Sequence, residues 1–316
     1  MKKTLFLLSL MISTVTMVGQ TSKTASSKPE TWYFKLGGSY FMQTAATEFP
    51  TVGGQPANKD VYTGNYPNNK LASRESVTGS FGEGFRSGVT AGYRFNARFG
   101  VELAANYYSS QSKTMAQTTN RLYAYNPNTT AATYLSFDAE GKIKAFDLAP
   151  AIVLFLGESH GFEPYTKVGV IVPVHGTLTI DTNKELLTYA GGNLVNTTKI
   201  AQTDVVKPNP TVGFMAALGT SYKLGSHISA FAELEYRNFT VHGKTKETTD
   251  YTVNEADQLS TLSVSAIHTN YRDKLDVNSN NSLTNSNVDT NRPMDELSSY
   301  VGISGLGLTL GLKYSL

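Results

Sequence analysis

In the last stretch of the chain, residues 299–316, apolar and polar residues alternate strictly from Leu306 onward. From Leu306 to Leu316 every second residue is Leu or Tyr, and the residues between them are small or polar. A period of two predicts a β-strand with one apolar face and one polar face. Similar alternation predicts seven earlier strands, at residues 32–41, 85–95, 99–110, 142–156, 162–175, 210–223 and 228–241.

The connections between these strands alternate between long and short. The short turns are residues 96–98, 157–161 and 224–227. The long polar stretches are residues 42–84, 111–141, 176–209 and 242–297. This rhythm predicts an all-β fold, an eight-stranded antiparallel up-and-down transmembrane β-barrel with short periplasmic turns and four long extracellular loops. Within it, Pro150 predicts a local bulge, because proline cannot donate to the ladder.

The first residues have the character of an export signal. Lys2 and Lys3 precede a short apolar run that ends near Gly19, which predicts a signal peptide over residues 1–19. The run is too short for a membrane-spanning helix. Residues 20–31 then read as a flexible periplasmic linker, and residues 32–316 as the barrel domain. The chain contains no Cys, which excludes disulfides, thiolate metal sites and a lipoprotein anchor.

The composition of the remaining chain argues against nucleic-acid binding. The full sequence has 27 basic and 25 acidic residues, and removal of Lys2 and Lys3 leaves 25 of each. Mean hydropathy is −0.23, and no long apolar segment follows the signal. A transmembrane β-barrel accounts for the low mean hydropathy, because its membrane-spanning strands alternate between apolar and polar residues and its loops are polar.

The end of the chain resembles the C-terminal assembly signal of bacterial outer-membrane β-barrels. Thr309, Gly311, Tyr314 and Leu316 stand where that signal has a polar residue, a glycine and two large apolar or aromatic residues. The usual last residue is Phe, so Leu316 departs from the pattern. The whole mature chain resembles the small outer-membrane barrels of the OmpW/OmpX and OmpA-barrel type, in the variety common among Bacteroidetes envelopes.

This resemblance implies an outer-membrane location and a monomer surrounded by lipid and lipopolysaccharide, inserted by the barrel-assembly machinery. Aromatic residues at the strand ends agree with it, since barrels carry aromatic girdles at both interfaces. The expected periplasmic girdle is Trp32, Phe95, Phe99, Phe155, Tyr222 and Tyr314. The expected outer girdle is Tyr40, Phe85, Tyr107, Phe146, Tyr236 and Tyr300.

The register assigns Leu103, Val170 and Leu234 to the lipid face and a set of charged residues to the lumen. That set is Lys35, Arg86, Arg94, Glu102, Asp147, Lys167, Glu233, Glu235 and Arg237, together with Lys313. Buried charges must be paired or hydrated. We therefore expect a salt-bridge network that holds the barrel closed; the alternative is a charged constriction that selects solutes. An eight-stranded barrel is just wide enough to be filled by side chains.

Small residues share the inward faces with these charges. One interpretation is that a narrow, strongly curved barrel needs them. The other is that they leave a cavity lined by Ile171, Met215 and Phe231, in which a small apolar ligand binds. The resemblance to OmpW-like proteins, which are thought to bind such ligands, supports the second interpretation. No cofactor is expected.

Catalytic and metal-binding signals are weak. His175 and His242 fall near outer strand ends with Asp181 and Asp250 nearby in sequence, a placement that chance explains in long loops. Residues 276–281 begin like a calcium loop but lack the glycine and the bidentate Glu that such a loop needs. We therefore expect neither a catalytic nor a metal site.

The sequence thus predicts a non-enzymatic outer-membrane protein, acting as a narrow conduit or binding site for small or lipophilic solutes or as a structural envelope component. The alternative is a surface adhesion or interaction protein that acts through its long extracellular loops. A soluble lipocalin-like barrel is a further alternative, but it would place charges such as Arg86 and Arg94 on the surface.

Overall fold

The computed structural model describes residues 32–209 and 211–316. The expected signal peptide and linker lie outside the described residues. Strands dominate the described chain, and its helical elements are one turn each, η1 (Leu259–Thr261) and α2 (Val264–Ile267).

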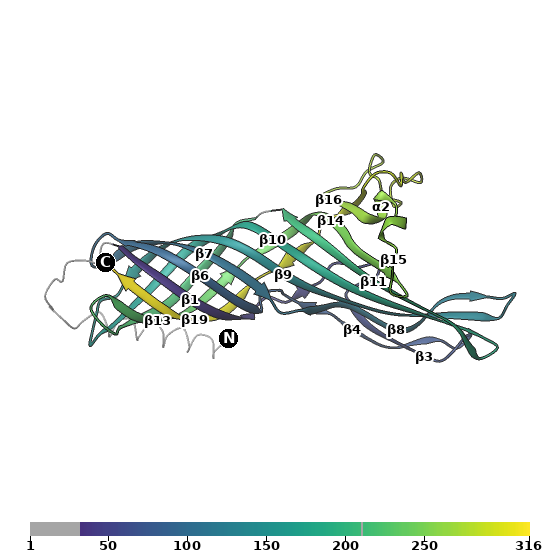
Figure 1. The fold of residues 1–316 in the computed structure, drawn as a ribbon, viewed down its shortest axis with the longest axis horizontal. Helices are drawn as coiled ribbons and strands as arrows, with labels where there is room; N and C mark the ends of the chain where they lie inside the picture. Colours follow the sequence, from purple (N-terminus) through teal and green to yellow (C-terminus); the bar gives the residue numbers. More distant parts are fainter. Residues whose placement is uncertain (1–31, 210) are drawn as a thin grey trace, which may run out of the picture.

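Eight strands pair side by side, and the last pairs with the first, so that they form a closed ring (Figure 1). Every neighbouring pair in the ring is antiparallel. In ring order the strands are β1 (Trp32–Gln43), β6 (Gly84–Arg94), β7 (Phe99–Ser110), β9 (Ala131–Phe155), β10 (Phe162–Ala190), β12 (Gly213–Lys223), β13 (Ile228–Asn238) and β19 (Gly305–Ser315). The closing ladder runs from Tyr33 opposite Ser315 to Gln43 opposite Gly305.

The two faces of the ring differ as the alternation requires. Leu103 and Leu234 are about half exposed on the outside, whereas their neighbours Glu102 and Glu233 are buried inside. The outward face of a strand is therefore apolar and its inward face is charged or small. Phe155 departs from the expected girdles because it is buried inside the ring, next to Tyr33 and Tyr165.

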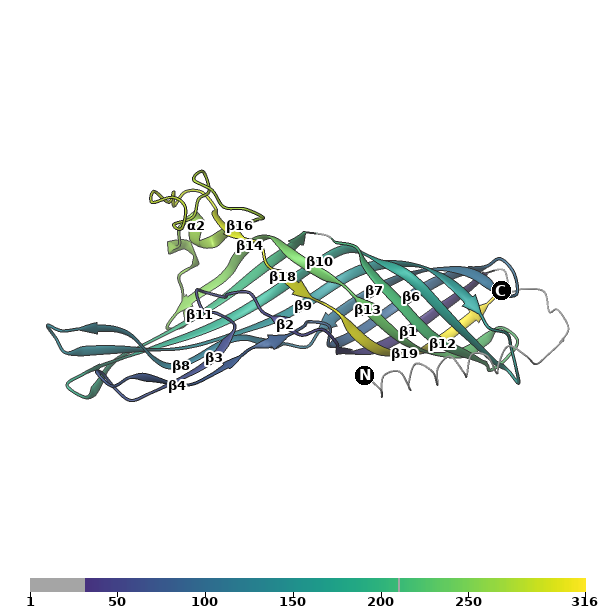
Figure 2. The same cartoon turned by 180° about the vertical axis from the view of Figure 1, so that it is seen from behind.

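The polar stretches that we expected to be loops are largely strands. Residues 111–141 contain β8 (Lys113–Asn126) and the first part of β9, and residues 176–209 contain the second part of β10 and β11 (Asn193–Asn209). Beyond the ring, residues 172–190 of β10 alone provide on the order of 60 Å of strand at about 3.3 Å per residue. Figure 2 shows the resulting sheet projecting from one end of the ring. We call this region the extension.

Shorter elements complete the extension. Between β1 and β6 lie β2 (Thr47–Glu48), β3 (Asn58–Thr63), β4 (Lys70–Ser76) and β5 (Thr78–Gly79). After β13 lie β14 (Thr240–Val253), β15 (Ala256–Asp257), β16 (His268–Arg272), β17 (Met294–Leu297) and β18 (Tyr300–Gly302). β14 pairs with β11, β16 and β18, so the last polar stretch folds back against the sheet.

The extension has an apolar core of its own. Phe81 and Met115 are fully buried in a cluster that also contains Phe137, Ile143 and Val301. Burial of aromatic and aliphatic side chains is the main favourable term in folding. The expected four extracellular loops are thus an ordered sheet with a packed core.

The wall of the ring has a seam where β10 leaves β12. Ile171 opposite Gly213 is the last pair of that ladder, and Leu178 opposite Val206 is the first pair between β10 and β11. Among the described residues, 172–177 form no pairs with 207–209 or 211–212. We call this break the seam; Val172, Val174 and Val212 flank it with exposed side chains.

The expected bulge at Pro150 is wrong. β7 and β9 stay in register through Pro150, which faces Leu103. The register shift lies instead between Pro173 and His175 of β10. On the other side of β9, the ladder with β10 has no pairs at residues 170–171 of β10, opposite Pro150. The missing N–H of Pro150 therefore leaves a short unpaired stretch in this ladder and no inserted residue.

Candidate functional site

The inside of the ring holds ten of the charged side chains, each at most 10% exposed. They are Lys35, Arg86, Arg94, Glu102, Asp147, Lys167, Glu233, Glu235, Arg237 and Lys313. We call them the lumenal network. They come from seven strands of the ring and meet in three groups, which lie at successive positions along the strands.

The central group is a square of two lysines and two glutamates. Lys35 Nζ lies 2.5 Å from Glu102 Oε1 and 3.0 Å from Glu233 Oε1. Lys167 Nζ lies 2.7 Å from Glu233 Oε2 and 3.4 Å from Glu102 Oε2. Each charge therefore has two opposite charges as neighbours, which offsets the cost of burying four ions in the interior of the ring.

The group toward the extension is built around two arginines. Arg86 donates two hydrogen bonds to Glu235, at 2.6 and 2.7 Å. Arg237 donates to Asp147 at 2.8 Å, and Asn106 donates to the same carboxylate at 2.9 Å. The bidentate arrangement of Arg86 and Glu235 combines charge with fixed geometry, which makes such pairs strong.

The group at the opposite end contains a residue that the sequence analysis missed. Arg94 Nη1 lies 2.7 Å from Glu163 Oε1, and Lys313 Nζ lies 3.7 Å from Glu163 Oε2. Glu163 precedes Lys167 by four residues on the same strand, so the period of two already placed it inside. Tyr33 and Tyr165 were also missed; their hydroxyls donate to Glu102 and Glu233 at 3.0 and 2.8 Å.

Aromatic rings fill the space above the inward glycines. A Cβ on Gly92 would lie 2.2 Å from the ring of Tyr33, and a Cβ on Gly219 would lie 2.6 Å from the ring of Tyr165. Phe231 covers Gly311 in the same way, at 2.6 Å.

The cavity that remains among the network residues is about 30 Å³, which is about the liquid volume of one water molecule. The expected apolar ligand cavity at Ile171, Met215 and Phe231 is therefore wrong. All three side chains are buried in packed surroundings.

Three residues of the expected assembly signal lie on β19, and the fourth, Leu316, follows it directly. Thr309 is buried, and its hydroxyl lies 2.7 Å from that of Ser39. Gly311 faces inward under Phe231. Tyr314 and Leu316 are exposed on the outer face.

A much larger cavity, of about 780 Å³, lies in the extension next to the ring. We call it the outer cavity. It is lined from β9, β10, β11, β14, β16, β17 and β18, and its volume falls in the range of about 300–1,000 Å³ that is usual for small-molecule sites. Apolar lining residues include Ile143, Ile180, Val206, Phe239, Val241 and Ile303. Pro173, Val174 and Pro208 line this cavity and also belong to the seam.

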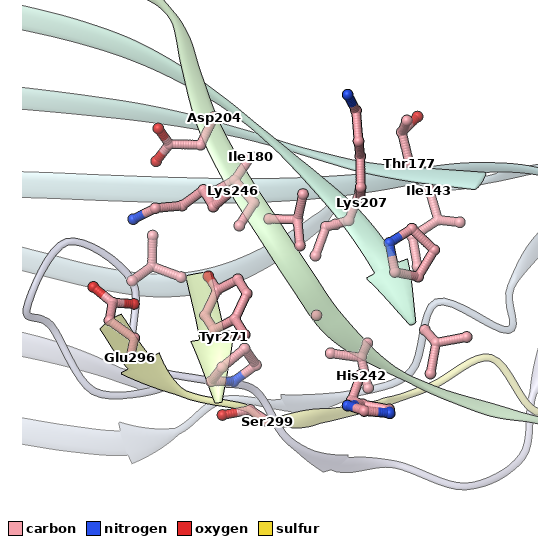
Figure 3. Close-up of a pocket in the computed structure, with 18 of the residues that line it drawn as sticks. Ile143, Thr177, Ile180, Asp204, Lys207, His242, Lys246, Tyr271, Glu296 and Ser299 are labelled. Carbon is pink, nitrogen blue, oxygen red and sulfur yellow. The ribbon is translucent and has the colours of Figure 1, made fainter. Parts of the chain in front are cut away.

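Figure 3 shows Lys246, Tyr271 and Glu296 together on one side of the outer cavity, whereas Lys207, Thr177 and His242 lie elsewhere around it. Tyr271 and Glu296 are direct partners in the parallel ladder of β16 and β17. Burial, and then the nearby carboxylates of Glu296 and Asp204, raise the pKa of Tyr271 above its ordinary value. Its hydroxyl is therefore a neutral hydrogen-bond donor near pH 7.

The residues singled out for chemistry do not converge on a catalytic arrangement. His175 and His242 both line the outer cavity. His242 Nδ1 lies 3.0 Å from the Ser298 hydroxyl, and Asp181 accepts a hydrogen bond from Thr203 at 2.8 Å. Asp250 is on β14, opposite Thr203 on the neighbouring strand.

The segment with the calcium-like start satisfies its own polar groups. The Asn280 side chain donates to the carbonyls of Asp289, Arg292 and Pro293, and Asp276 accepts from the Asn278 amide at 2.9 Å. In the described part of the chain, no group of three or more acidic or histidine side chains is placed to hold a metal ion. Nor does any helix there have the length and apolar character of a membrane span.

Comparison with known proteins identifies the family. No curated protein sequence matches the chain. The crystal structure of the outer membrane protein OprG from Pseudomonas aeruginosa is similar at a TM-score of 0.40 and 12% sequence identity, over 90% of this chain and 95% of that one. The family model described as the outer membrane protein beta-barrel domain matches residues 36–258, well over half of the chain. The chain therefore belongs to the outer membrane protein beta-barrel domain family.

Proposed function

We propose that this protein is a non-enzymatic, eight-stranded transmembrane barrel that binds small lipophilic molecules in its outer cavity. The ring spans the outer membrane and the extension stands outside the cell. Ring strands such as β6, β12, β13 and β19 have 11 residues each, which suits a tilted crossing of about 9–11 residues. Export by a signal peptide over residues 1–19 belongs to this proposal.

A wide aqueous pore does not fit the ring. The lumenal network and the rings of Tyr33 and Tyr165 leave only a cavity of about 30 Å³ among the charges. We infer that the network holds the barrel closed and stabilises its interior. A solute would have to displace paired, buried charges to pass, which is costly.

The observation that carries the proposal is the outer cavity itself. It is large, mainly apolar in its lining and adjacent to the seam. Exposed valines flank the seam on the lipid side. A lipophilic molecule dissolved in the outer leaflet would therefore meet an apolar break in the wall instead of a continuous hydrogen-bonded ladder. The seam is the entry route that we propose.

Binding of an apolar fluorescent probe, N-phenyl-1-naphthylamine, to the protein in lipid nanodiscs tests this function. Ala145 lines the cavity, and Ala145→Trp should weaken binding at least tenfold by filling it. Val195→Trp, at an exposed position on the distal end of the extension, is the matched control and should bind like the wild type. Equal binding by wild type and Ala145→Trp would refute the cavity as the site. A steady ion conductance of the wild type in planar bilayers would refute the closed lumen.

A second candidate function is adhesion through the distal hairpins of the extension. Residues 119–135 and 186–198 form these hairpin ends and contain no Asp or Glu. Tyr123, Leu194 and Val195 are each more than half exposed there. Tyrosines and small polar residues give contact area and adaptable hydrogen bonding, as in antibody binding loops.

Cell binding tests the adhesion candidate. Replacement of Tyr123, Leu194 and Val195 by Ser should abolish binding of beads that carry the protein to neighbouring cells, if this function holds. Cavity binding should be unchanged in the same variant. Beads that bind equally well after the replacement would remove the adhesion candidate.

The remaining partners are those of a barrel in this membrane. We propose that the protein is a monomer surrounded by lipid and lipopolysaccharide. We also propose that the barrel-assembly machinery recognises the signal formed by Thr309, Gly311, Tyr314 and Leu316. The outward placement of Tyr314 and Leu316 supports this, because both remain accessible on the surface of the last strand.

A further inference from the structure

The side of the outer cavity opposite Ile143 contains three hydrogen-bonding side chains without a hydrogen-bond partner in the part of the chain that the structure describes. Across residues 32–209 and 211–316, the side chains of Lys246, Tyr271 and Glu296 make no hydrogen bond or ion pair. Asp204, beside them, is different: it accepts hydrogen bonds from Thr248 at 2.6 Å and from Gln202 at 2.9 and 3.1 Å.

The strand register brings the three side chains together. Lys246 pairs with Thr269, so it is the diagonal neighbour of Tyr271 on the same face of β14 and β16, a spacing that long side chains bridge. Glu296 pairs with Tyr271 across β16 and β17. Figure 3 shows all three on one side of the cavity, with Ile143 and Thr177 on the other.

These groups differ in what they can bind. The Lys246 ammonium donates to an anion, the Glu296 carboxylate accepts from a cation, and the Tyr271 hydroxyl donates to an acceptor. An alkane would leave all three without partners, and buried polar groups without partners are costly. Asp204 and Lys207 also line the cavity, but Asp204 is already hydrogen-bonded and Lys207 lies apart from the three. A head group of either single charge would satisfy one of Lys246 and Glu296 and oppose the other.

We propose that the ligand of the outer cavity is a single-chain amphiphile with a zwitterionic head. Its anionic group binds Lys246 and Tyr271, its cationic group binds Glu296, and its tail lies on the apolar floor formed by Phe239, Val241 and Ile303. This rests on the proposed function, because it names the class of molecule that the cavity takes.

A series of ligands with one tail and four heads tests the proposal. The probes are N-octylglycine, nonanoate, octylamine and octan-1-ol, which share an octyl tail and are titrated by calorimetry against the protein in lipid nanodiscs, with empty nanodiscs as background. N-octylglycine should bind about tenfold or more tightly than octan-1-ol, since hydrogen bonds to charged groups exceed neutral ones by about that factor.

Variants then assign the two charges. Lys246→Met should weaken binding of nonanoate and N-octylglycine about tenfold and leave binding of octan-1-ol unchanged. Glu296→Gln should do the same for octylamine and N-octylglycine. Lys244→Met and Glu247→Gln are the matched controls, because both residues are exposed on β14 and outside the cavity lining, and neither should change binding.

The outcomes separate this inference from the function on which it rests. If all four probes bind the wild type equally, or if Lys246→Met and Glu296→Gln leave the preference unchanged, the zwitterionic head is wrong while the lipophile cavity stands. If no probe binds above the background of empty nanodiscs, both are wrong.

Discussion

Lys35 Nζ lies 2.5 Å from Glu102 Oε1 in the middle of the ring, although β1 and β7 are not paired strands. Glu233 and Lys167 complete the square from β13 and β10. Side chains from four strands are thus tied together by charge, and the stability of the ring should depend on complete pairing.

Replacing one charged residue of this square should destabilise the protein more than replacing one lysine and one glutamate together. Glu233→Gln leaves two lysines sharing Glu102, so the free energy of unfolding should fall by about 3–5 kcal/mol. The double variant Glu233→Gln/Lys167→Met should regain a large part of this loss. The measurement is equilibrium unfolding in urea in lipid vesicles.

The matched control for this prediction is Glu158→Gln. Glu158 pairs with Lys223 at 2.8 Å at the surface, and exposed pairs contribute at most about 1 kcal/mol. A Glu233→Gln variant as stable as Glu158→Gln would show that the lumenal network does not hold the ring together.

The orientation of the ring faces gives a second prediction. Arginine at Leu103, Val170 or Leu234 should cost roughly 2–4 kcal/mol, the cost of Arg on the lipid face at the bilayer midplane. Refolding yield into lipid vesicles measures this. Thr249→Arg, at an exposed position on β14, is the control and should refold normally. Full tolerance at all three ring positions would mean that these side chains do not face lipid.

The alternation of apolar and polar residues predicted the ring because the two faces of a ring strand lie in different surroundings, such as membrane on one side and lumen or water on the other. Glu102 beside Leu103 is the clearest case. The extension was not predicted because the distal parts of β10 and β11 have no buried face, so that polar residues such as Thr197, Thr198 and Lys199 occur on both faces. The hydrogen-bonded ladders continue through these segments, although apolar and polar residues do not alternate in their sequence.

The residues that face the lumen were largely predicted, but the contacts among their side chains were not. The period of two identifies which residues face inward, but not how far their side chains reach. Tyr165 covers Gly219 on the neighbouring strand, and only the register between β10 and β12 determines this contact. The same limit applies to the outer cavity, whose lining residues come from strands far apart in the sequence.

The last strand gives a third prediction. Changing Tyr314 and Leu316 together to Ser should block assembly, because both large residues of the expected signal are lost. Each side chain also contributes roughly 1.5–3 kcal/mol if fully buried in lipid. Outer-membrane yield, judged by fractionation and by altered gel migration without boiling, is the readout. Ser at Tyr123 and Leu194 is the control, and normal yield of the Tyr314/Leu316 variant would contradict the prediction.

Acid should loosen the segment around Asn280. Burial opposes ionisation of Asp295, but the Asn280 amide and the Arg272 guanidinium, both at 2.9 Å, hold its pKa below the ordinary value. A depressed pKa in the folded state stabilises the fold above the unfolded pKa of about 3.9. That stabilisation is lost as the pH falls below about 4 and through the folded pKa.

Hydrogen exchange over residues 276–293 tests this expectation. Exchange should accelerate between pH 5 and pH 3, after correction for the intrinsic rate, and Asp295→Asn should show the faster exchange already at pH 7. Asp273→Asn, an exposed residue of the same segment, should behave like the wild type. Unchanged exchange in Asp295→Asn would show that Asp295 does not anchor the segment.

The most direct test of the central claim is the position of a bound lipophile. Crystals of the protein soaked with 1-bromooctane should give a bromine anomalous peak in the outer cavity, among Ile143, Val241 and Tyr271. The peak should disappear in Ala145→Trp. A peak inside the ring among Lys35, Glu102 and Glu233, or an empty outer cavity at saturating ligand, would contradict the account.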